Sequence, residues 1–272
     1  MLTSLLVKAA PLALLGWLAV APPTPPHKTK VYLIGDSTMA NKTLANFPET
    51  GWGMPLVTFF DTTVVVDNRA QNGRSTRTFL AENRWQPVVS ALQPGDYVFI
   101  QFGHNDESPD KPERYTSPAD YRQNLVKFVT ETRAKKGIPI LLTPVTRRYF
   151  DPAGHIKETH GPYSAATVAV AKEQHVTLVD MDQLSRALLQ QLGDETSKLL
   201  FMQLEPGDHP NYPLGRHDNT HFNELGARRM AQLVVHDLLA QHVALVEEHL
   251  AKPLAKNAVA APSGAAAQPT TP

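Results

Sequence analysis

Residues 30–38 read KVYLIGDST, an apolar run that stops at a glycine and continues into polar residues. Four similar runs follow along the chain: TTVVVDN at residues 62–68, DYVFIQFG at 96–103, IPILLTPVT at 138–146 and VTLVDM at 176–181. Near-continuous apolar strands of this kind are typical of parallel sheets that are covered on both faces. We therefore predict a parallel sheet of roughly five strands.

Longer segments with helical periodicity lie between the predicted strands. Residues 119–136 place Tyr121, Leu125 and Phe128 on one face, and Gly137 follows as a helix stop signal. Further helices are predicted at residues 163–174, 182–201 and 224–250. Strands that alternate with helices indicate βαβ units. The predicted fold class is therefore α/β, as a doubly wound domain.

The two ends of the chain differ in composition from the middle. Residues 1–21 place Lys8 before an apolar run and end in Ala-Val-Ala, which is typical of a signal peptide. The apolar run at residues 11–20 is shorter than the ~20 residues of a membrane-spanning helix. We predict an exported protein without stable membrane insertion, with an N-terminal anchor as the alternative. The predicted organisation is a signal peptide (1–21), a proline-rich linker (22–28), one domain (29–252) and a disordered Ala/Pro-rich tail (253–272).

The overall composition excludes several classes of function. The 26 basic and 26 acidic side chains cancel, so the sequence offers no strongly basic face for a nucleic acid. There is no cysteine, which excludes disulfides, thiolate nucleophiles and cysteine-ligated zinc. We expect a neutral or weakly charged substrate, no nucleic-acid partner and a monomer.

Polar or glycine-rich turns follow three of the predicted strands. Ser37 follows the first strand, residues 68–75 (NRAQNGRS) follow the second, and residues 104–106 (HND) follow the third. Open α/β sheets bind their ligands beyond the carboxyl ends of the strands. We therefore expect these three turns to converge on one site.

These turns, with one later segment, contain the groups that acyl transfer needs, which are a nucleophile, an oriented base and oxyanion donors. Ser37 is the candidate nucleophile, and the carboxylate of Asp218 can reach the ring of His221 three residues later. Gly73 can expose its backbone N–H, and Asn105 offers a side-chain amide. Each residue has an ordinary alternative as a turn former or helix cap. Their occurrence together at successive strand ends favours catalysis.

Four segments of the chain resemble the signature blocks of SGNH (GDSL-like) hydrolases. They are IGDSTMA at residues 34–40, NGRST at 72–76, FGHND at 102–106 and DNTHFNELGA at 218–227. The forms GDST, GHND and DxTHFN are similar to those of the rhamnogalacturonan acetylesterase branch of this superfamily. The resemblance covers nearly the whole predicted domain.

The resemblance implies a three-layer, flavodoxin-like α/β/α fold and the deacetylation of pectin without a metal or cofactor. It implies Ser37 as nucleophile, His221 as base and Asp218 as the residue that orients the base. Gly73, Asn105 and the backbone N–H of Ser37 are the implied oxyanion donors. The implied partner is an acetylated polysaccharide or oligosaccharide.

Other polar side chains near these blocks are candidate substrate contacts. Paired guanidinium groups suit a uronate carboxylate, although roles in turns or as solvated charges are the alternatives. Trp52 and Trp85 are candidate sugar platforms, but tryptophan in a helical pattern is more often a core residue. The candidate substrate contacts are Asn68, Arg74, Arg147 and Arg148.

Several other functions stay open at this point. The substrate could be xylan or another acetylated carbohydrate, or a lipid, as for a lysophospholipase or thioesterase. The polar sequence around the site favours sugar over lipid. A metal-dependent hydrolase would use His217 and His221, at spacing i,i+4, together with His209. A non-catalytic carbohydrate-binding protein would need the groove but no activated serine.

Overall fold

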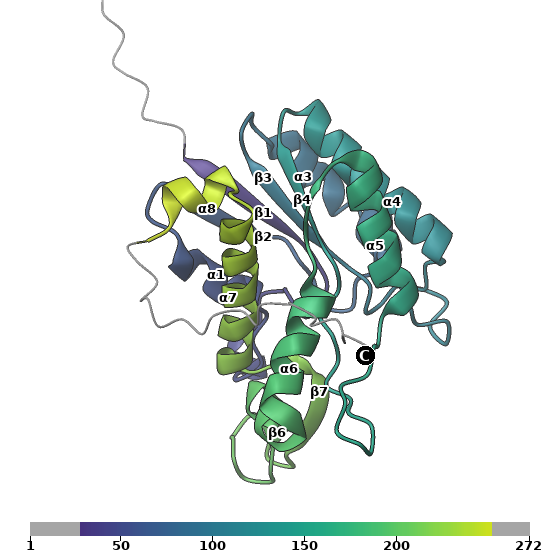
Figure 1. Ribbon diagram of the computed structural model, residues 1–272, viewed down its shortest axis with the longest axis vertical. Coiled ribbons are helices and arrows are strands. Elements are labelled where there is room, and N and C mark those ends of the chain that lie inside the picture. Colours follow the sequence, from purple (N-terminus) through teal and green to yellow (C-terminus); the bar gives the residue numbers. More distant parts are fainter. Residues whose placement is uncertain (1–27, 252–272) are drawn as a thin grey trace, which may run out of the picture.

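Five parallel strands form the central sheet of the protein, in the order β2-β1-β3-β4-β5 (Figure 1). The computed structural model describes residues 28–251; the predicted leader, most of the linker and the predicted tail lie outside them. Each strand lies within or overlaps one predicted run, so the prediction of a five-stranded parallel sheet is confirmed. The strands are β1 (Thr29–Gly35), β2 (Val64–Asn68), β3 (Tyr97–Gln101), β4 (Ile138–Leu142) and β5 (Thr177–Val179).

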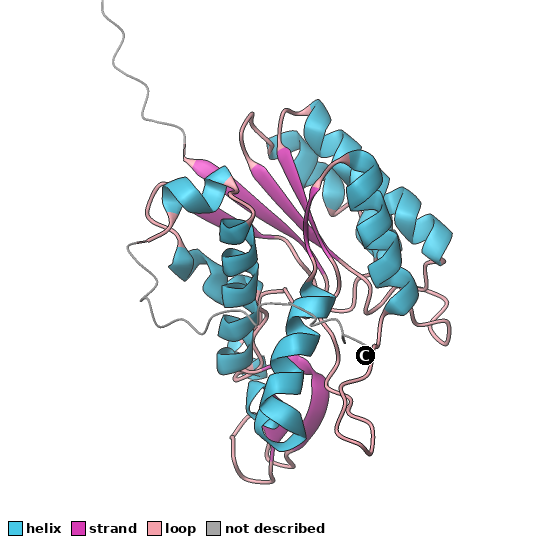
Figure 2. Cartoon of the chain, viewed as in Figure 1, coloured by secondary structure: helices cyan, strands magenta, loops and turns pink. Residues whose placement is uncertain are grey.

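Helices cover both faces of this sheet (Figure 2). Successive residues of β1 point to opposite faces: Val31 and Leu33 belong to one hydrophobic core, and Tyr32 and Ile34 to the other. The first core includes residues of α1 (Gly53–Leu56), α6 (Met181–Ser197), α7 (Glu224–Ala240) and α8 (Ala244–His249). The second includes residues of α2 (Thr76–Ala81), α3 (Trp85–Ala91), α4 (Pro118–Ala134) and α5 (Gly161–Gln174). The predicted three-layer α/β/α architecture is confirmed.

The strand order determines where a ligand can bind. The chain passes from β1 to β2 on one side and then to β3 on the other side of β1. This order, 2-1-3-4-5, is that of flavodoxin-like sheets, which bind ligands at the carboxyl ends of the strands where the connections diverge. Ser37 follows β1 and Asn105 follows β3, so both lie at this switch point.

Two predicted helices are shorter than expected. The helix predicted at 182–201 ends earlier, at Ser197, and bends at Gly193, whose φ is 73°. The helix predicted at 224–250 is two helices, because α7 ends at Ala240 and α8 begins at Ala244. Between them His242 has a φ of 55°, a left-handed conformation that a right-handed helix cannot contain. No helix within residues 28–251 is long and apolar enough to cross a membrane.

A second, antiparallel pair of strands lies apart from the main sheet (Figure 1). It consists of β6 (Phe201–Leu204) and β7 (Arg216–Phe222). The sequence analysis did not predict this pair, because β7 reads RHDNTHF and lacks the apolar alternation of a half-buried strand. The remaining elements are the 3-10 helices η1 (Leu44–Asn46), η2 (Val57–Phe59) and η3 (Lys198–Leu200).

Both tryptophans considered as sugar platforms are core residues. Trp52 is buried, and its indole N–H donates to Gln101 Oε1 at 2.7 Å. Trp85 is also buried, and its indole N–H donates to Glu131 Oε2 at 2.6 Å. A buried indole with its N–H satisfied offers no face to a sugar. The core alternative is therefore correct for both residues.

Candidate active site

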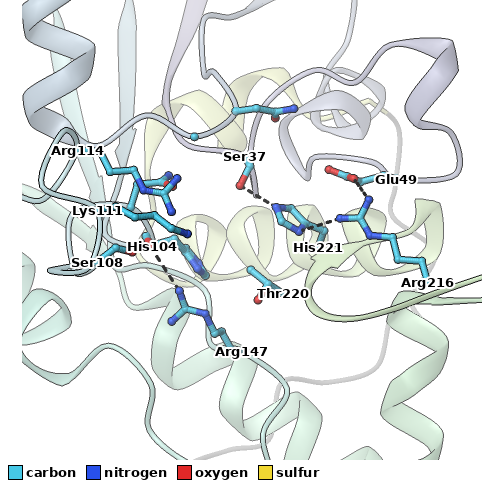
Figure 3. A pocket seen from close by; sticks show the side chains of 13 residues that line it. Ser37, Glu49, His104, Ser108, Lys111, Arg114, Arg147, Arg216, Thr220 and His221 are labelled. Atoms are coloured by element: carbon cyan, nitrogen blue, oxygen red, sulfur yellow. Dashed lines mark hydrogen bonds and ion pairs between the residues drawn. The ribbon is translucent and has the colours of Figure 1, made fainter.

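Ser37 lies in a tight turn directly after β1. The carbonyl of Asp36 accepts the N–H groups of Met39 at 3.3 Å and Ala40 at 3.1 Å. The buried Asp36 carboxylate accepts the N–H of Thr38 at 3.0 Å. Lys42 Nζ donates to the Ser37 carbonyl at 2.7 Å. These contacts position the backbone of Ser37, and its hydroxyl points toward His221 (Figure 3).

His221 reaches Ser37 from β7. In the β6–β7 pair, Phe201 faces Phe222 and the next residue, Met202, faces Asp218, so residues 219–221 have no partner in β6. A bulge changes the direction in which the side chains of a strand point, and bulges are frequent next to functional sites. His221 Nε2 lies 2.9 Å from Ser37 Oγ, within hydrogen-bonding distance.

Asp218 orients the imidazole ring of His221. Its Oδ2 lies 2.8 Å from His221 Nδ1, and its Oδ1 accepts the backbone N–H of His221 at 2.9 Å. Arg216 Nη2 also donates to Oδ2, at 2.6 Å. Burial alone raises the pKa of Asp218, but the hydrogen bonds from His221 and Arg216 outweigh it and hold the pKa well below its ordinary value. Asp218 therefore stays ionised beside the ring.

A chain of partly and fully buried charges continues from Asp218 to the turn that carries Ser37. Arg216 Nη1 pairs with Glu49 Oε2 at 2.9 Å, and Glu49 Oε1 pairs with Lys42 Nζ at 2.8 Å. Lys42 then donates to the Ser37 carbonyl, so the chain links both ends of the Ser37–His221 pair. Only 2% of the Lys42 side chain and 6% of the Glu49 side chain are exposed, so breaking one partner would leave an uncompensated buried charge.

The residues expected to provide the oxyanion donors share one pocket with the Ser37 hydroxyl. Ser37, Gly73 and Asn105 all line one pocket of about 460 Å³. Gly73 has a φ of 76°, the positive value that the sequence analysis expected of a turn glycine. The Asn105 amide donates one N–H to the carbonyl of Arg74 at 3.0 Å, which leaves its second N–H available to a ligand. This arrangement can stabilise an oxyanion formed next to Ser37.

Three of the four candidate substrate contacts lie outside this pocket lining. Asn68 donates its amide to the Met39 carbonyl at 2.9 Å. Arg74 bonds Glu82 and the Asn72 carbonyl. Both side chains bond the local loops, and their contact with substrate stays a prediction.

Arg148 is buried and has protein partners, and its contact with substrate also stays a prediction. Only 6% of its side chain is exposed, and it is ion-paired with Asp194 and bonded to Asn219 Oδ1 at 3.0 Å. Arg147 is the only one of the four that lines the pocket, and its guanidinium is ion-paired with Glu107. Its charge is therefore already balanced by a protein carboxylate.

The geometry disagrees with the metal-dependent alternative. His217 and His221 lie on a strand, where residues four apart are separated by roughly 13 Å along the chain, unlike on a helix. Both ring nitrogens of His221 are engaged, by Ser37 and Asp218. His217 lies next to Gln203 Oε1, at 3.3 Å. Within residues 28–251 no cluster of three metal-ligating side chains is present.

Several residues that line the pocket or support the site were not predicted from the sequence, among them Lys42. Arg216 and Glu49 belong to the charge chain. The position of Arg216 two residues before Asp218 was the one signal in the sequence that could have suggested Arg216. His104 was quoted only as part of the FGHND block; burial lowers its pKa well below the ordinary value, so its ring is neutral. Lys111 and Arg114 come from the charged loop after β3.

Comparisons with known proteins show the family to which the chain belongs. Residues 33–229 match the model of the GDSL-like Lipase/Acylhydrolase family. The chain is 40% identical to a rhamnogalacturonan acetylesterase of Bacillus subtilis, RhgT, over 75% of this chain and 87% of that protein. It is 27% identical to a rhamnogalacturonan acetylesterase of Emericella nidulans, over 79% of this chain and 86% of that protein.

Solved structures share the fold. The crystal structure of protein YXIM from Bacillus subtilis superposes with a TM-score of 0.70 at 30% identity, over 80% of this chain and 58% of that one. The acetylxylan esterase Axe2 of Geobacillus stearothermophilus superposes with a TM-score of 0.58 at 22% identity, over 77% of this chain and 94% of that one. The family match covers well over half of the chain. The chain therefore belongs to the GDSL-like lipase/acylhydrolase family of carboxylic ester hydrolases.

Proposed function

We propose that this chain is a serine esterase that removes O-acetyl groups from plant cell-wall polysaccharide, with acetylated rhamnogalacturonan or pectin as its preferred substrate. The observation that carries the proposal is the hydrogen-bonded line from Ser37 through His221 to Asp218, in a pocket that also contains Gly73 and Asn105. The names of two Bacillus subtilis relatives support the substrate: a rhamnogalacturonan acetylesterase at 40% identity and a probable rhamnogalacturonan acetylesterase at 37% identity.

In the proposed reaction Ser37 Oγ attacks the carbonyl carbon of the acetyl ester while His221 Nε2 takes the hydroxyl proton. The negative charge moves to the carbonyl oxygen, where the N–H groups of Ser37 and Gly73 and the amide of Asn105 stabilise it. The tetrahedral intermediate collapses, the bond to the sugar oxygen breaks, and His221 returns the proton to that oxygen. Asp218 stabilises the imidazolium meanwhile.

Water then releases the acetyl group from Ser37. His221 takes a proton from the water, whose oxygen attacks the acetyl carbonyl in the same oxyanion environment. Collapse of the second tetrahedral intermediate expels the Ser37 oxygen, which recovers its proton from His221. The products are acetate and a free sugar hydroxyl, and this cycle uses only these residues and water.

The pocket predicts a preference for short acyl groups. It is lined by charged and polar side chains such as Glu49, Lys111 and Arg147, and it offers no apolar wall to an acyl chain. A buried methylene would contribute about 0.8 kcal/mol, so an apolar groove would favour an octanoyl over an acetyl ester by up to roughly 5 kcal/mol. We expect a flat or falling kcat/KM from acetyl to octanoyl among p-nitrophenyl esters. Rates that rise with acyl length would refute the carbohydrate substrate and favour a lipid-directed esterase.

The polysaccharide itself is tested by comparing acetylated pectic fragments with acetylated xylan of similar length. The proposal expects a higher kcat/KM on the pectic fragments. Equal activity on both polymers would make the protein a general carbohydrate acetylesterase and would leave the serine mechanism standing.

The charge chain behind Asp218 gives a second prediction. In the variant Arg216→Gln, Asp218 loses a charged hydrogen bond, so we expect kcat/KM to fall by about 10- to 100-fold. Steady-state kinetics with p-nitrophenyl acetate measures this fall.

The matched control is Arg216→Lys, which keeps the positive charge and should restore most of kcat/KM. If Arg216→Gln kept the full kcat/KM, the charge chain behind Asp218 would not contribute to catalysis. Thermal unfolding of both variants checks that the fold is intact.

We also propose that the protein is exported after removal of residues 1–21 and acts as a monomer. The support for export is the basic residue, the apolar run and the small residues that end this segment. Mass spectrometry of the protein recovered outside the cytoplasm tests the cleavage site. Light scattering tests the monomer, and a dimer at working concentration would contradict it.

A further inference from the structure

The loop between β3 and α4, residues 102–117, brings two cationic side chains to the pocket. Lys111 and Arg114 line it together with His104 and Ser108. Figure 3 shows them across Ser37 and His221 from Arg216. The cations of the pocket thus lie on both sides of the reacting hydroxyl.

These cations differ in whether a protein carboxylate balances them. Arg147 is ion-paired with Glu107, and Arg216 with Glu49 and Asp218. Within residues 28–251, the side chains of Lys111 and Arg114 form no ion pair and no hydrogen bond. Of the other acids of the loop, Asp106 is buried and bonded to Thr76, and Asp110 and Glu113 are exposed; none of the three lines the pocket. Lys111 and Arg114 are therefore the cations that can still bind an anion.

Arg114 has the stronger requirement for a partner. Its Nε is buried and has no hydrogen-bond acceptor. A buried donor of a charged group without an acceptor costs free energy that a bound acceptor would restore. The planar guanidinium fork matches the two oxygens of a carboxylate, which the ammonium of Lys111 complements as a point charge.

The position of Arg114 would place a bound anion close to the reacting groups. A Cβ added to Gly73 would lie 3.9 Å from Arg114 Nη1, so the guanidinium lies beside a proposed oxyanion donor. An anionic group held there belongs to the sugar whose ester is cleaved or to a sugar next to it in the chain.

The loop is also held in place before any ligand binds. Arg77 Nη1 donates to the carbonyls of Pro112 and Tyr115, both at 3.3 Å. The Tyr163 hydroxyl donates to the carbonyl of Thr116 at 2.7 Å. A loop that is ordered in advance loses less conformational entropy on binding.

We infer that Lys111 and Arg114 form a subsite for the carboxylate of a uronic acid residue in the substrate polysaccharide. This subsite rests on the carbohydrate esterase function proposed above. It takes the place of the pair Arg147 and Arg148, which the sequence analysis considered for the same carboxylate. The charge of Arg147 is already balanced, and Arg148 lies outside the pocket lining.

The test is competitive inhibition, measured with p-nitrophenyl acetate as the reporter substrate. The probes are unacetylated oligogalacturonate and the same oligosaccharide with its carboxyl groups converted to neutral methyl esters. For the wild-type protein we expect an inhibition constant about 10- to 100-fold lower for the acidic probe, the size expected for a hydrogen bond to a charged group. Added salt should reduce this advantage.

The variants separate the two side chains from the rest of the pocket. Arg114→Gln and Lys111→Gln should each remove most of the advantage of the acidic probe, and Arg114→Lys should retain part of it. The matched control is Lys172→Gln, because Lys172 is exposed near the end of α5, which leads back to the amino ends of the strands. Labelling of Ser37 by a fluorophosphonate shows that each variant keeps a folded site.

Two outcomes would overturn the subsite, and they are distinguishable. The subsite is refuted if the wild-type protein binds both probes equally, or if Arg114→Gln keeps the full advantage of the acidic probe. In that case the loop does not bind the carboxylate, and the esterase proposal stands. If neither probe inhibits although p-nitrophenyl acetate is cleaved, the pectic substrate fails together with the subsite.

Discussion

Replacing Ser37 with alanine is expected to lower kcat on acetyl esters by about 10⁴- to 10⁶-fold, the range found when the nucleophile of a serine hydrolase is removed. The alanine has no oxygen to attack the ester carbonyl, so no acyl-enzyme can form. The Ser37 hydroxyl points into the pocket toward His221 and contributes little packing. We therefore expect thermal unfolding to stay close to that of the wild-type protein.

The control for this variant is Ser90→Ala, which removes the hydroxyl of an exposed serine in α3. It should keep wild-type turnover. A fluorophosphonate should label the wild-type protein and the Ser90 variant at Ser37, and should leave the Ser37 variant unlabelled. Near wild-type turnover in Ser37→Ala would end the serine-esterase proposal, and a wild-type protein that is not labelled would favour a non-catalytic binding protein.

Replacing His221 with alanine should be nearly as damaging as the loss of Ser37. Without the ring, no group within reach of Ser37 Oγ accepts its proton, and Asp218 has no imidazolium to stabilise. The two residues act as one unit, so the double variant should be little worse than either single variant. Measurement of kcat for the two single variants and the double variant tests this expectation directly.

His217→Ala is the matched control, since His217 lies on the same strand with 64% of its side chain exposed. It should keep most of the activity. EDTA should also leave the wild-type activity intact. If the fold-losses in kcat of the two single variants multiplied in the double variant, His221 and Ser37 would act independently. If EDTA abolished the wild-type activity and His217→Ala also lost activity, a metal-dependent hydrolase would be favoured.

The sequence by itself determined the sheet and the residues at its edge. A strand buried on both faces needs nearly continuous apolar residues, and this local pattern identified all five strands. Ser37, Gly73 and Asn105 follow such strands directly, and parallel strands bring their carboxyl ends to one edge. Their common pocket therefore follows from local composition and from the rule for parallel sheets.

The second sheet could not be predicted in this way. The residues of β7 are polar, and their strand conformation comes from pairing with β6 and not from an apolar face. The same pairing produces the bulge of residues 219–221, which turns His221 toward Ser37. The spacing of Asp218 and His221 predicted that they would interact, but only the tertiary structure shows how His221 reaches Ser37, 184 positions away.

The tertiary structure alone decided which charges are free. Arg148 meets Asp194 across 46 positions of sequence, and Arg216 meets Glu49 across 167. No local pattern encodes such distant partners, so the sequence offered Arg148 as a substrate contact and did not distinguish Lys111. Folding neutralises one and leaves the other facing the pocket, because ion pairing depends on distances of a few ångströms in space and not on spacing along the chain.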